Sequence, residues 1–248
     1  APKKKKEKMS LVDSFKFLIR SKHLGFIALL VICYGISQNV IEGVWKGQIK
    51  EVFTSENSYN AFMGRFSMVT GMITICFMLI GTNIVRIFGW LVSALLTPVL
   101  ILLTGVLFFS FISFKGELNG WTLAAFAMSP TMLAVWLGFG QNVICKATKY
   151  SLFDPTKEMA YIPLDQELKV KGKAAVAVIG GRLGKSGGAV VQQFLLLTVS
   201  TTATQITIAP YSCAIMVVVI LAWMYAAGGL STMYNQKVAE KERELQAA

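Results

Sequence analysis

Five long stretches of this chain contain no Asp, Glu, Lys or Arg. They run from Leu24 to Ile41, from Phe66 to Val85, from Ile87 to Phe114, from Leu118 to Cys145 and from Gly187 to Gln236. A helix rising about 1.5 Å per residue needs roughly 20 apolar residues to cross a hydrocarbon core of about 30 Å. Each of the first four stretches therefore predicts one membrane crossing, and the fifth, of 50 residues, predicts most of two.

The expected fold class is an all-α integral membrane protein with six transmembrane helices. We expect these helices at residues 24–45, 61–84, 88–113, 121–145, 174–199 and 207–230. A soluble domain usually has about a quarter of its residues charged, whereas only 15% of this chain is charged. This shortage of ionic surface excludes a soluble enzyme, a nucleic-acid-binding domain and a disordered tail.

The net charge of +11 reflects membrane topology rather than a nucleic-acid partner. With six helices in these places, 18 of the 24 Lys and Arg residues fall on one side of the membrane and four on the other side or its rim. Such an excess of positive residues marks the cytoplasmic side. Both termini are therefore expected in the cytoplasm or an equivalent compartment. The two remaining cations, Arg182 and Lys185, lie inside the fifth helix.

The segments outside the membrane helices complete the expected organisation. The chain begins at Ala1 without a methionine, so its lysine-rich start looks like an internal connector. Ser10 and Asp13 have the spacing of a capping box and predict a short interfacial helix. The full division is a basic linker at 1–8, an interfacial helix at 9–23, transmembrane helices 1 to 4 at 24–149, a cytoplasmic loop at 150–173, transmembrane helices 5 and 6 at 174–234 and a cytoplasmic tail at 235–248.

The sequence contains few residues of the types that catalysis or metal binding requires. Its four cysteines fall in expected membrane helices without a paired spacing, and His23 is the single histidine. We expect free, buried thiols and no disulfide or zinc framework. The string LGKSGG resembles part of a P-loop, but that motif needs a glycine where Ile179 stands. We therefore expect no enzyme activity, no catalytic residue, no metal site and no cofactor.

One internal repeat relates the first and fourth helices. GISQNVIEGVWK spans residues 35–46 and GFGQNVICKATK spans residues 138–149, and the strings agree at six of twelve positions. Coincidence between two apolar helices is one explanation. The other is a duplicated three-helix unit, as in transporters of the major facilitator type, where inverted three-helix repeats form each six-helix half. In that architecture the first and fourth helices of a half line the central cavity.

Polar side chains of the first helix form one stripe. Polar groups inside a bilayer are costly, so each is a candidate functional residue. Gln38, Asn39, Glu42 and Lys46 recur at spacings of three and four residues. Glu42 precedes Lys46 by four residues, which is the favourable order for a helical ion pair. This pair is either structural, at the outer rim, or places Glu42 on a cavity wall as a gate partner or an ion-coupling carboxylate.

The fifth helix contains two cations deep in the expected membrane region. If the helix begins near residue 174, Lys185 lies about 17 Å along it, close to the middle of the bilayer. Arg182 and Lys185 need anionic partners at that depth, and Glu42 is the one carboxylate within the expected membrane helices. This excess of positive over negative charge favours a ligand with several negative groups, which indicates phosphates.

Glycines surround these two cations. Gly180, Gly184 and Gly188 recur every four residues. One role for such a stripe is close packing against another helix. The other is exposure of backbone N–H groups to a phosphate, and the two roles are compatible. Gly184 and Ser186, which flank Lys185, are therefore included among the site candidates.

Four strings carry a resemblance to a known family. YSLFDPTKEMAYIPLDQELKVKGKAA, GRLGKSGG, CYGISQNVIEGVWK and YNAFMGRFS closely resemble the ATP/ADP translocases of obligate intracellular bacteria and plastid envelopes, and the likeness runs from about Leu11 to Leu230. The resemblance implies twelve membrane helices of major-facilitator type, with this chain as the C-terminal half and the lysine linker joining the halves. It also implies a multi-pass protein of a bacterial inner membrane or a plastid inner envelope, with cytoplasmic or stromal termini.

The resemblance further implies a secondary active carrier that exchanges ATP for ADP plus phosphate. Its partners are then ATP, ADP, phosphate, the lipid bilayer and the N-terminal half of the same transporter, with no nucleic acid. Glu42 and Lys185 match charged positions on which transport in the family depends. The positions that match polar, cavity-facing residues of the family are Asn39, Lys46, Asn142 and Lys149.

The resulting hypothesis is alternating access, with Lys185 and Arg182 binding phosphates near the middle of the membrane. The substrate-binding candidates are Lys185, Arg182, Glu42, Asn39, Gln38, Lys46, Asn142, Lys149, Gly184 and Ser186. Two alternatives remain: a cation-coupled symporter of nucleotides or other organic phosphates, and a membrane scaffold without transport. Ala177 departs from the family, which commonly has an aspartate there, and so removes a carboxylate that could pair with Arg182 or Lys185.

Overall fold

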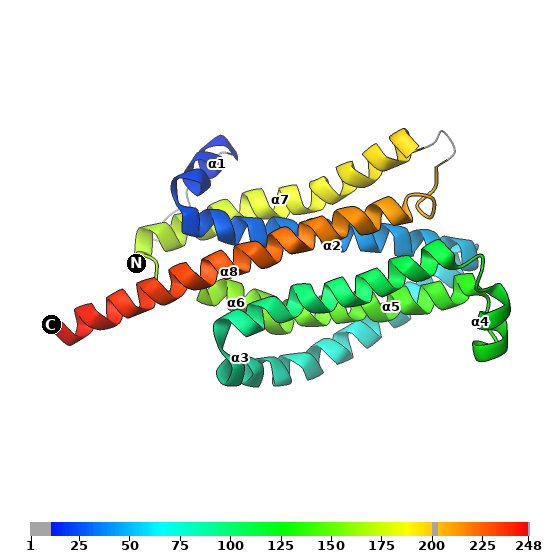
Figure 1. Cartoon of the computed structure of the whole chain (residues 1–248), viewed down its shortest axis with the longest axis horizontal. Helices are drawn as coiled ribbons and strands as arrows, with labels where there is room; N and C mark the ends of the chain where they lie inside the picture. Colours follow the sequence, from blue (N-terminus) through cyan, green and yellow to red (C-terminus); the bar gives the residue numbers. More distant parts are fainter. Residues whose placement is uncertain (1–10, 200–202, 248) are drawn as a thin grey trace.

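The computed structural model describes residues 11–199 and 203–247, and every regular element in those residues is helical. The elements are α1 (Leu11–Arg20), α2 (Lys22–Val52), α3 (Glu56–Phe114), α4 (Asn119–Phe126), α5 (Pro130–Thr148), the π-helix η1 (Lys149–Phe153), α6 (Asp154–Met159), α7 (Gln166–Val199) and α8 (Ala209–Ala247). The long helices run along the long axis of the molecule (Figure 1). Ser10 of the expected capping box and the linker at 1–8 lie outside the described residues.

Serine side chains begin three of the long helices. The hydroxyl oxygens of Ser21, Ser55 and Ser129 accept backbone N–H groups in the first turns of α2, α3 and α5. Such a cap satisfies a donor that has no partner within the helix. Pro130 occupies the first turn of α5, where its missing N–H removes no helical hydrogen bond. Local sequence therefore sets where these helices start.

A single element, α3, contains the two helices expected at 61–84 and 88–113. It is 59 residues long and bends at Gly89, whose backbone has φ 75° and ψ −179°. Glycine adopts this φ readily because it has no Cβ. Both arms extend from the bend toward the end of the molecule where α4 lies (Figure 1). The two apolar stretches are thus two helical arms that meet at the non-helical Gly89.

Three helices of the described chain are long and apolar enough to cross a membrane: α2, α3 and the stretch Ala209–Glu240 of α8. A fourth span results if Gly120–Phe126 and Pro130–Met159, bent by 66° at the break between them, count as one. α7 has 34 residues but is less apolar and is not among these spans. With these apolar helices, the chain is a multi-pass membrane protein.

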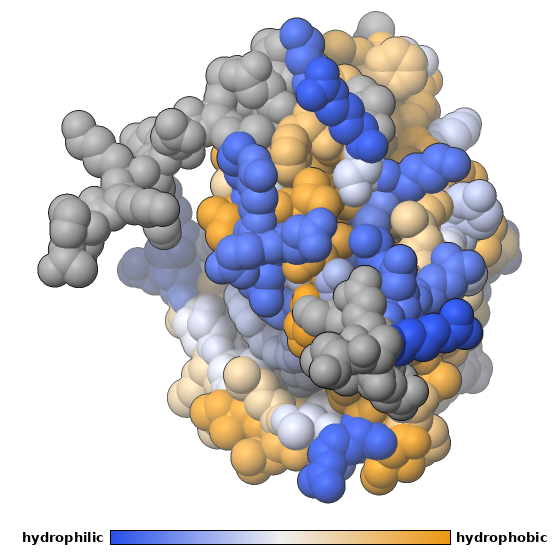
Figure 2. Space-filling view, turned by 90° about the vertical axis from the view of Figure 1, so that its left-hand side faces the viewer, coloured by the Kyte–Doolittle hydropathy of each residue, from blue (hydrophilic) through white to orange (hydrophobic). Residues whose placement is uncertain are grey.

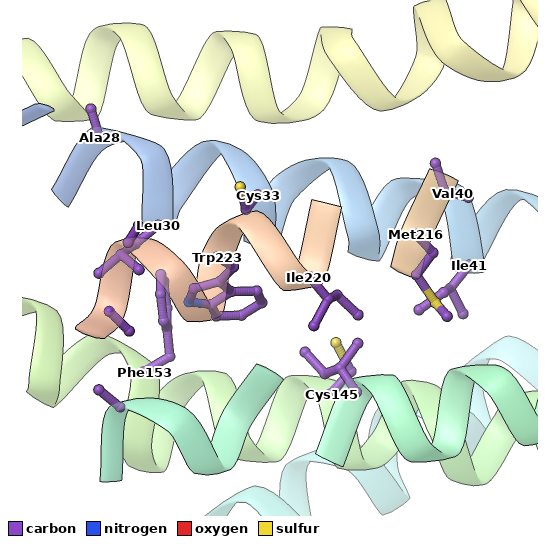
Figure 3. Close-up of a cluster of buried hydrophobic side chains, with 14 of the residues drawn as sticks. Ala28, Leu30, Cys33, Val40, Ile41, Cys145, Phe153, Met216, Ile220 and Trp223 are labelled. Atoms are coloured by element: carbon purple, nitrogen blue, oxygen red, sulfur yellow. The ribbon is translucent and has the colours of Figure 1, made fainter. Parts of the chain in front are cut away.

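The apolar core lies where α2 packs against α8 and α5. Trp223 of α8 is fully buried, and its ring centroid lies 5.2 Å from that of Phe153 and 5.9 Å from that of Tyr34. Figure 3 shows Trp223 and Met216 of α8 lying among the side chains of the neighbouring helices, with Met216 beside Ile41 of α2. These contacts place α2 in the middle of the molecule, between α8 and α7.

The segment at 150–173 differs from the hydrophilic loop expected there. It is largely helical, since η1 and α6 cover its first part and α7 begins at Gln166. Trp90 Nε1 donates to the Thr156 carbonyl at 2.8 Å, and a 2.7 Å hydrogen bond joins His23 Nε2 to the Ala160 carbonyl. The segment is therefore packed against α2 and α3. The polar composition of this segment predicted a solvent-exposed loop. Its burial, as at Tyr161, depends on contacts with residues distant in sequence.

Charged side chains gather at the end of the molecule where α6, the start of α7 and the late part of α8 lie. Figure 2 looks onto this end and shows hydrophilic residues across it, with hydrophobic residues around them. Asp154 forms an ion pair with Lys157 at 3.0 Å, and Glu158 forms one with Lys173. Such a polar cap on an apolar bundle matches the water-facing end of a membrane protein.

Candidate functional site

Glycines bring α7 into close contact with α2. A Cβ added to Gly35 of α2 would lie 2.6 Å from the Cα of Gly184 of α7, and one added to Gly188 would lie 2.5 Å from the Cβ of Asn39. At such distances neither helix has room for a larger side chain. The glycine stripe of the fifth expected helix thus serves helix packing, and it carries its neighbours to the polar face of α2.

A cavity of about 610 Å³ lies between α2, α7 and the end of α5 with η1. It is lined by Val31, Tyr34, Gly35, Gln38, Asn39, Glu42, Lys146, Lys149, Tyr150, Gly180, Gly181, Gly184 and Lys185. Tyr150 and Lys185 are exposed, so the cavity is open to the surroundings of this chain. Three helical regions far apart in sequence therefore form one polar site.

A line of hydrogen bonds joins α2 to α5 beside this cavity. Glu42 Oε1 lies 2.9 Å from Lys46 Nζ in an ion pair. Gln38 Nε2 donates to Glu42 Oε2 at 3.4 Å and to Asn142 Oδ1 at 3.0 Å. Asn142 Nδ2 in turn donates to the Gly138 carbonyl at 2.9 Å. The polar stripe of α2 thus meets Asn142 of the repeated Gln-Asn pair, and Gln38, which is bonded to Asn142, donates to the Glu42 carboxylate.

Three lysines line the cavity against one carboxylate, Glu42. Lys149 Nζ lies 2.6 Å from Asp154 Oδ2, so this lysine already has an anionic partner. Lys146 Nζ lies 4.6 Å from the centroid of the Phe66 ring, a cation–π distance. Among the described residues, neither Lys146 nor Lys185 has a carboxylate within ion-pair distance. The cavity therefore carries uncompensated positive charge.

The structure brings six of the ten candidate residues to this cavity: Gln38, Asn39, Glu42, Lys149, Gly184 and Lys185. The other four do not line it. Lys46 and Asn142 touch lining residues through the contacts just described, whereas Arg182 and Ser186 are exposed on α7. Arg182 and Lys185 are thus separated, because the turn of α7 directs only Lys185 into the cavity.

Some residues that line the cavity were not predicted from the sequence. Lys146, Tyr34 and Tyr150 line it but were not among the substrate-binding candidates. A signal for Lys146 existed, since it follows Asn142 by four residues and therefore shares its helix face. No comparable signal marked Tyr34, because a tyrosine in an apolar helix usually packs in the core.

No group of three His, Cys, Asp or Glu side chains is placed to hold a metal ion in residues 11–199 and 203–247. Cys33, Cys76, Cys145 and Cys213 are free thiols. Cys145 is buried and donates its S–H to Gln38 Oε1, so it takes part in the polar contacts between α2 and α5. The polar groups at and beside the cavity are lysines, amides, tyrosine hydroxyls, one thiol and one carboxylate.

The fold and the cavity define a helical, multi-pass membrane protein with a polar, cationic site between its helices. Residues 1–234 match the sequence model of the TLC ATP/ADP transporter family. No solved structure matches the chain.

Known carriers are similar over nearly the whole chain. ADP,ATP carrier protein 1 of Rickettsia conorii is 48% identical over 242 residues, which cover 97% of this chain and 48% of that protein. ADP,ATP carrier protein 1 of Chlamydia muridarum is 47% identical over 247 residues, 99% of this chain and 46% of that protein. The plastidic ATP/ADP-transporter of Solanum tuberosum is 47% identical over 242 residues, 98% of this chain and 38% of that protein.

This chain belongs to the TLC ATP/ADP transporter family, a family of carriers rather than enzymes. It spans about half the length of the curated relatives that it matches.

Proposed function

We propose that this chain is the C-terminal half of a twelve-helix carrier of major-facilitator type, which exchanges ATP for ADP plus phosphate by alternating access. The observation that carries the proposal is the excess of lysines over carboxylates in the cavity of about 610 Å³. Its single carboxylate, Glu42, is already paired with Lys46. A polyanionic ligand compensates such a site through charge-assisted hydrogen bonds. The names of the relatives, which are ADP,ATP carriers, support the nucleotide as that ligand.

Six membrane crossings are consistent with the described helices. α2, the two arms of α3, the bent pair of α4 and α5, α7 and α8 account for them. α7 is the least apolar of these crossings, and its glycine face is covered by α2 while Lys185 faces the cavity. Charged residues in membrane helices face the protein interior or a water-filled cavity rather than lipid. α7 therefore crosses as a cavity wall.

The distribution of Lys and Arg supports cytoplasmic or stromal termini. The polar end of the bundle, which Figure 2 shows, is then the cytoplasmic or stromal end. The membrane is a bacterial inner membrane or a plastid inner envelope, by analogy with the rickettsial, chlamydial and potato relatives.

Lys185 and Lys146 are the proposed phosphate-binding residues, because both lie at the cavity without a carboxylate partner among the described residues. Lys149 joins them when it leaves Asp154. Gln38 and Asn142 position Glu42, whose pairing with Lys46 suits a gate or a coupling site. A direct contact between Arg182 and phosphate stays a prediction.

The N-terminal half of the carrier supplies the facing wall of the cavity in this proposal. Lys185 and Tyr150 are exposed in this chain, so the site is incomplete on one side. Alternating access follows if the two halves rock about this shared site. The alternative of a six-helix scaffold without transport does not explain why unpaired cations line an open cavity.

Exchange in liposomes tests the proposal. The complete carrier is reconstituted with ADP inside, and uptake of labelled ATP is measured for wild type, Lys185→Ala and Arg182→Ala. We expect Lys185→Ala to lower exchange at low ATP concentration by at least about tenfold, the loss expected for one charge-assisted contact to phosphate. Arg182→Ala tests the second predicted phosphate contact, and we expect it to lower exchange less than Lys185→Ala does, because Arg182 does not line the cavity.

The outcome separates the alternatives. Undiminished exchange in Lys185→Ala would refute its phosphate contact. ATP uptake that needs no ADP inside but requires a cation gradient would indicate a symporter instead. Absence of both uptake and thermal stabilisation by ATP in wild type would indicate a scaffold.

A further inference from the structure

A second cavity, of about 550 Å³, lies between the end of α2 and the first turns of α3 and α5. Aromatic rings form much of its wall. The ring centroids of Phe53 and Phe62 lie 4.8 Å apart in a stacked pair, and Trp136 lies 6.0 Å from Phe62 and 5.3 Å from Phe139. Trp136 is 44% exposed, so its ring is accessible within this cavity. We call this second cavity the aromatic pocket.

The aromatic pocket adjoins the lysine-lined cavity. Phe66 links the two, since its ring lies 5.4 Å from that of Phe139 and under Lys146 Nζ. Trp136, Phe139 and Lys146 follow one another at spacings of three and seven residues, which places them on the same face of α5. The helix rise from Phe139 to Lys146 is about 10 Å. Phe66 is 2% exposed and lines neither site, so a ligand that extends along α5 into both sites must pass this ring.

Arg65 distinguishes the aromatic pocket from a surface that faces lipid. It lines this pocket, is exposed and has no ion pair among the described residues. An arginine in a membrane helix usually faces a water-filled cavity or the bundle interior. Ligand sites combine apolar and aromatic walls with a few polar groups that orient the ligand, and the aromatic pocket has this composition.

We propose that the aromatic pocket binds the nucleobase while the lysine-lined cavity binds the phosphates. The inference rests on the proposed function, because it assigns the second part of the same ligand. A planar base stacks on the face of Trp136, and aromatic stacking contributes strongly to base binding. The Arg65 guanidinium donates hydrogen bonds to ring nitrogens of the base, which are acceptors. Trp136 and Arg65 are then determinants of specificity.

Binding of two ligands to the purified, complete carrier tests this assignment. ADP carries base and phosphates, whereas pyrophosphate carries phosphates alone. In Trp136→Ala we expect the Kd for ADP to rise by about tenfold or more, as for loss of one stacking partner. The Kd for pyrophosphate should change by less than about twofold, within ordinary experimental scatter. Trp136→Phe should keep most of the ADP affinity, because a smaller ring still stacks.

Trp121→Ala is the matched control. Trp121 lies on α4, is 57% exposed and stacks edge-on with Phe126, but does not line the aromatic pocket. It should leave both dissociation constants unchanged. If Trp136→Ala does not fold, Phe139→Leu offers the same comparison.

Each result has one meaning. Equal ADP affinity in wild type and Trp136→Ala would overturn the base site while leaving the phosphate site intact. An equal loss of ADP and pyrophosphate binding would also overturn it, since damage to the whole cavity would explain both. A wild-type carrier that binds neither ligand would overturn the proposed function and this inference together.

Discussion

Gly35 of α2 and Gly184 of α7 touch through their backbones. An added Cβ on Gly35 would lie 2.6 Å from the Cα of Gly184, and one on Gly184 would lie 3.1 Å from the Cα of Gly35. Because Lys185 follows Gly184 directly, this contact determines how far the lysine lies from the polar face of α2. Helix packing and the geometry of the site are therefore coupled at one place.

Replacing Gly184 by valine should separate α7 from α2. We expect a loss of about 1–3 kcal/mol in the free energy of unfolding, the usual cost of overpacking, together with loss of exchange. Denaturant unfolding in detergent and liposome uptake measure the two effects. Gly71→Val on α3 is the control, because Gly71 does not line the cavity and nothing lies within 4 Å of a Cβ at that position. Equal stability of the two variants would contradict the close contact.

Neighbouring amides of α5 should respond differently to substitution. Asn142 is fully buried and hydrogen-bonded through both Nδ2 and Oδ1. Asn142→Leu should lower the free energy of unfolding by about 1–3 kcal/mol, because it leaves buried polar groups without partners. Gln141 is 2% exposed, and neither of its amide atoms has a partner in the described part of the chain.

Gln141→Leu is therefore expected to be neutral or stabilising, since it removes unsatisfied groups. Chemical denaturation of both variants in the same detergent makes the comparison. A larger loss for Gln141→Leu than for Asn142→Leu would mean that Gln141 has a partner in the working protein, such as a buried water.

Under the proposed function, Asp154 competes with the substrate for Lys149. The two side chains lie 2.6 Å apart, and Lys149 also lines the cavity. Asp154→Asn should free Lys149 for phosphate and lower the Kd for ATP by about fivefold, equivalent to ~1 kcal/mol. The gain should shrink at high salt, because exposed charge interactions are screened. Calorimetric titration at two salt concentrations measures both quantities.

Asp165→Asn is the matched control for this experiment. Asp165 is an exposed carboxylate of the same segment and forms no ion pair among the described residues. It should not change the affinity for ATP. A weaker affinity in Asp154→Asn would mean that Asp154 orients Lys149 for the ligand rather than competing for it.

Tyr161, between α6 and α7, should make stability fall in alkali. Burial, and to a smaller extent the charge of Glu158, raises the pKa of its phenol above the ordinary value. The unfolded chain ionises near pH 10, whereas the folded protein keeps the phenol neutral. The stabilisation is thus complete below about pH 10 and is lost as the pH rises toward the folded pKa.

Tyr161→Phe should reduce this alkaline loss, because phenylalanine does not ionise. Thermal unfolding followed between pH 8 and about pH 11 compares the two proteins across the ordinary tyrosine pKa. Parallel curves for the variant and the wild type would show that Tyr161 ionises as readily in the folded protein as in the unfolded chain, against the raised pKa.

Much of the site was predictable because its members obey helical spacing. Gln38, Glu42 and Lys46 share one face at four-residue intervals, and the structure joins them by an ion pair and a hydrogen bond. The hydrophilic loop expected at 150–173 is largely helical in the structure. Buried Phe153 and Tyr161 hold that segment against the bundle, and their packing depends on α2, α3 and α8 rather than on neighbouring residues.

By itself, the sequence determined that this chain lies in a membrane, and it located the polar stripe of α2 and the glycine-flanked Lys185. Both results follow from local composition and the helical repeat. Only the tertiary structure decided that Lys146 joins Lys185 at the cavity and that Arg182 does not. The reason is that this choice depends on how α2, α5 and α7 are rotated against one another, which contacts between residues more than a hundred positions apart determine.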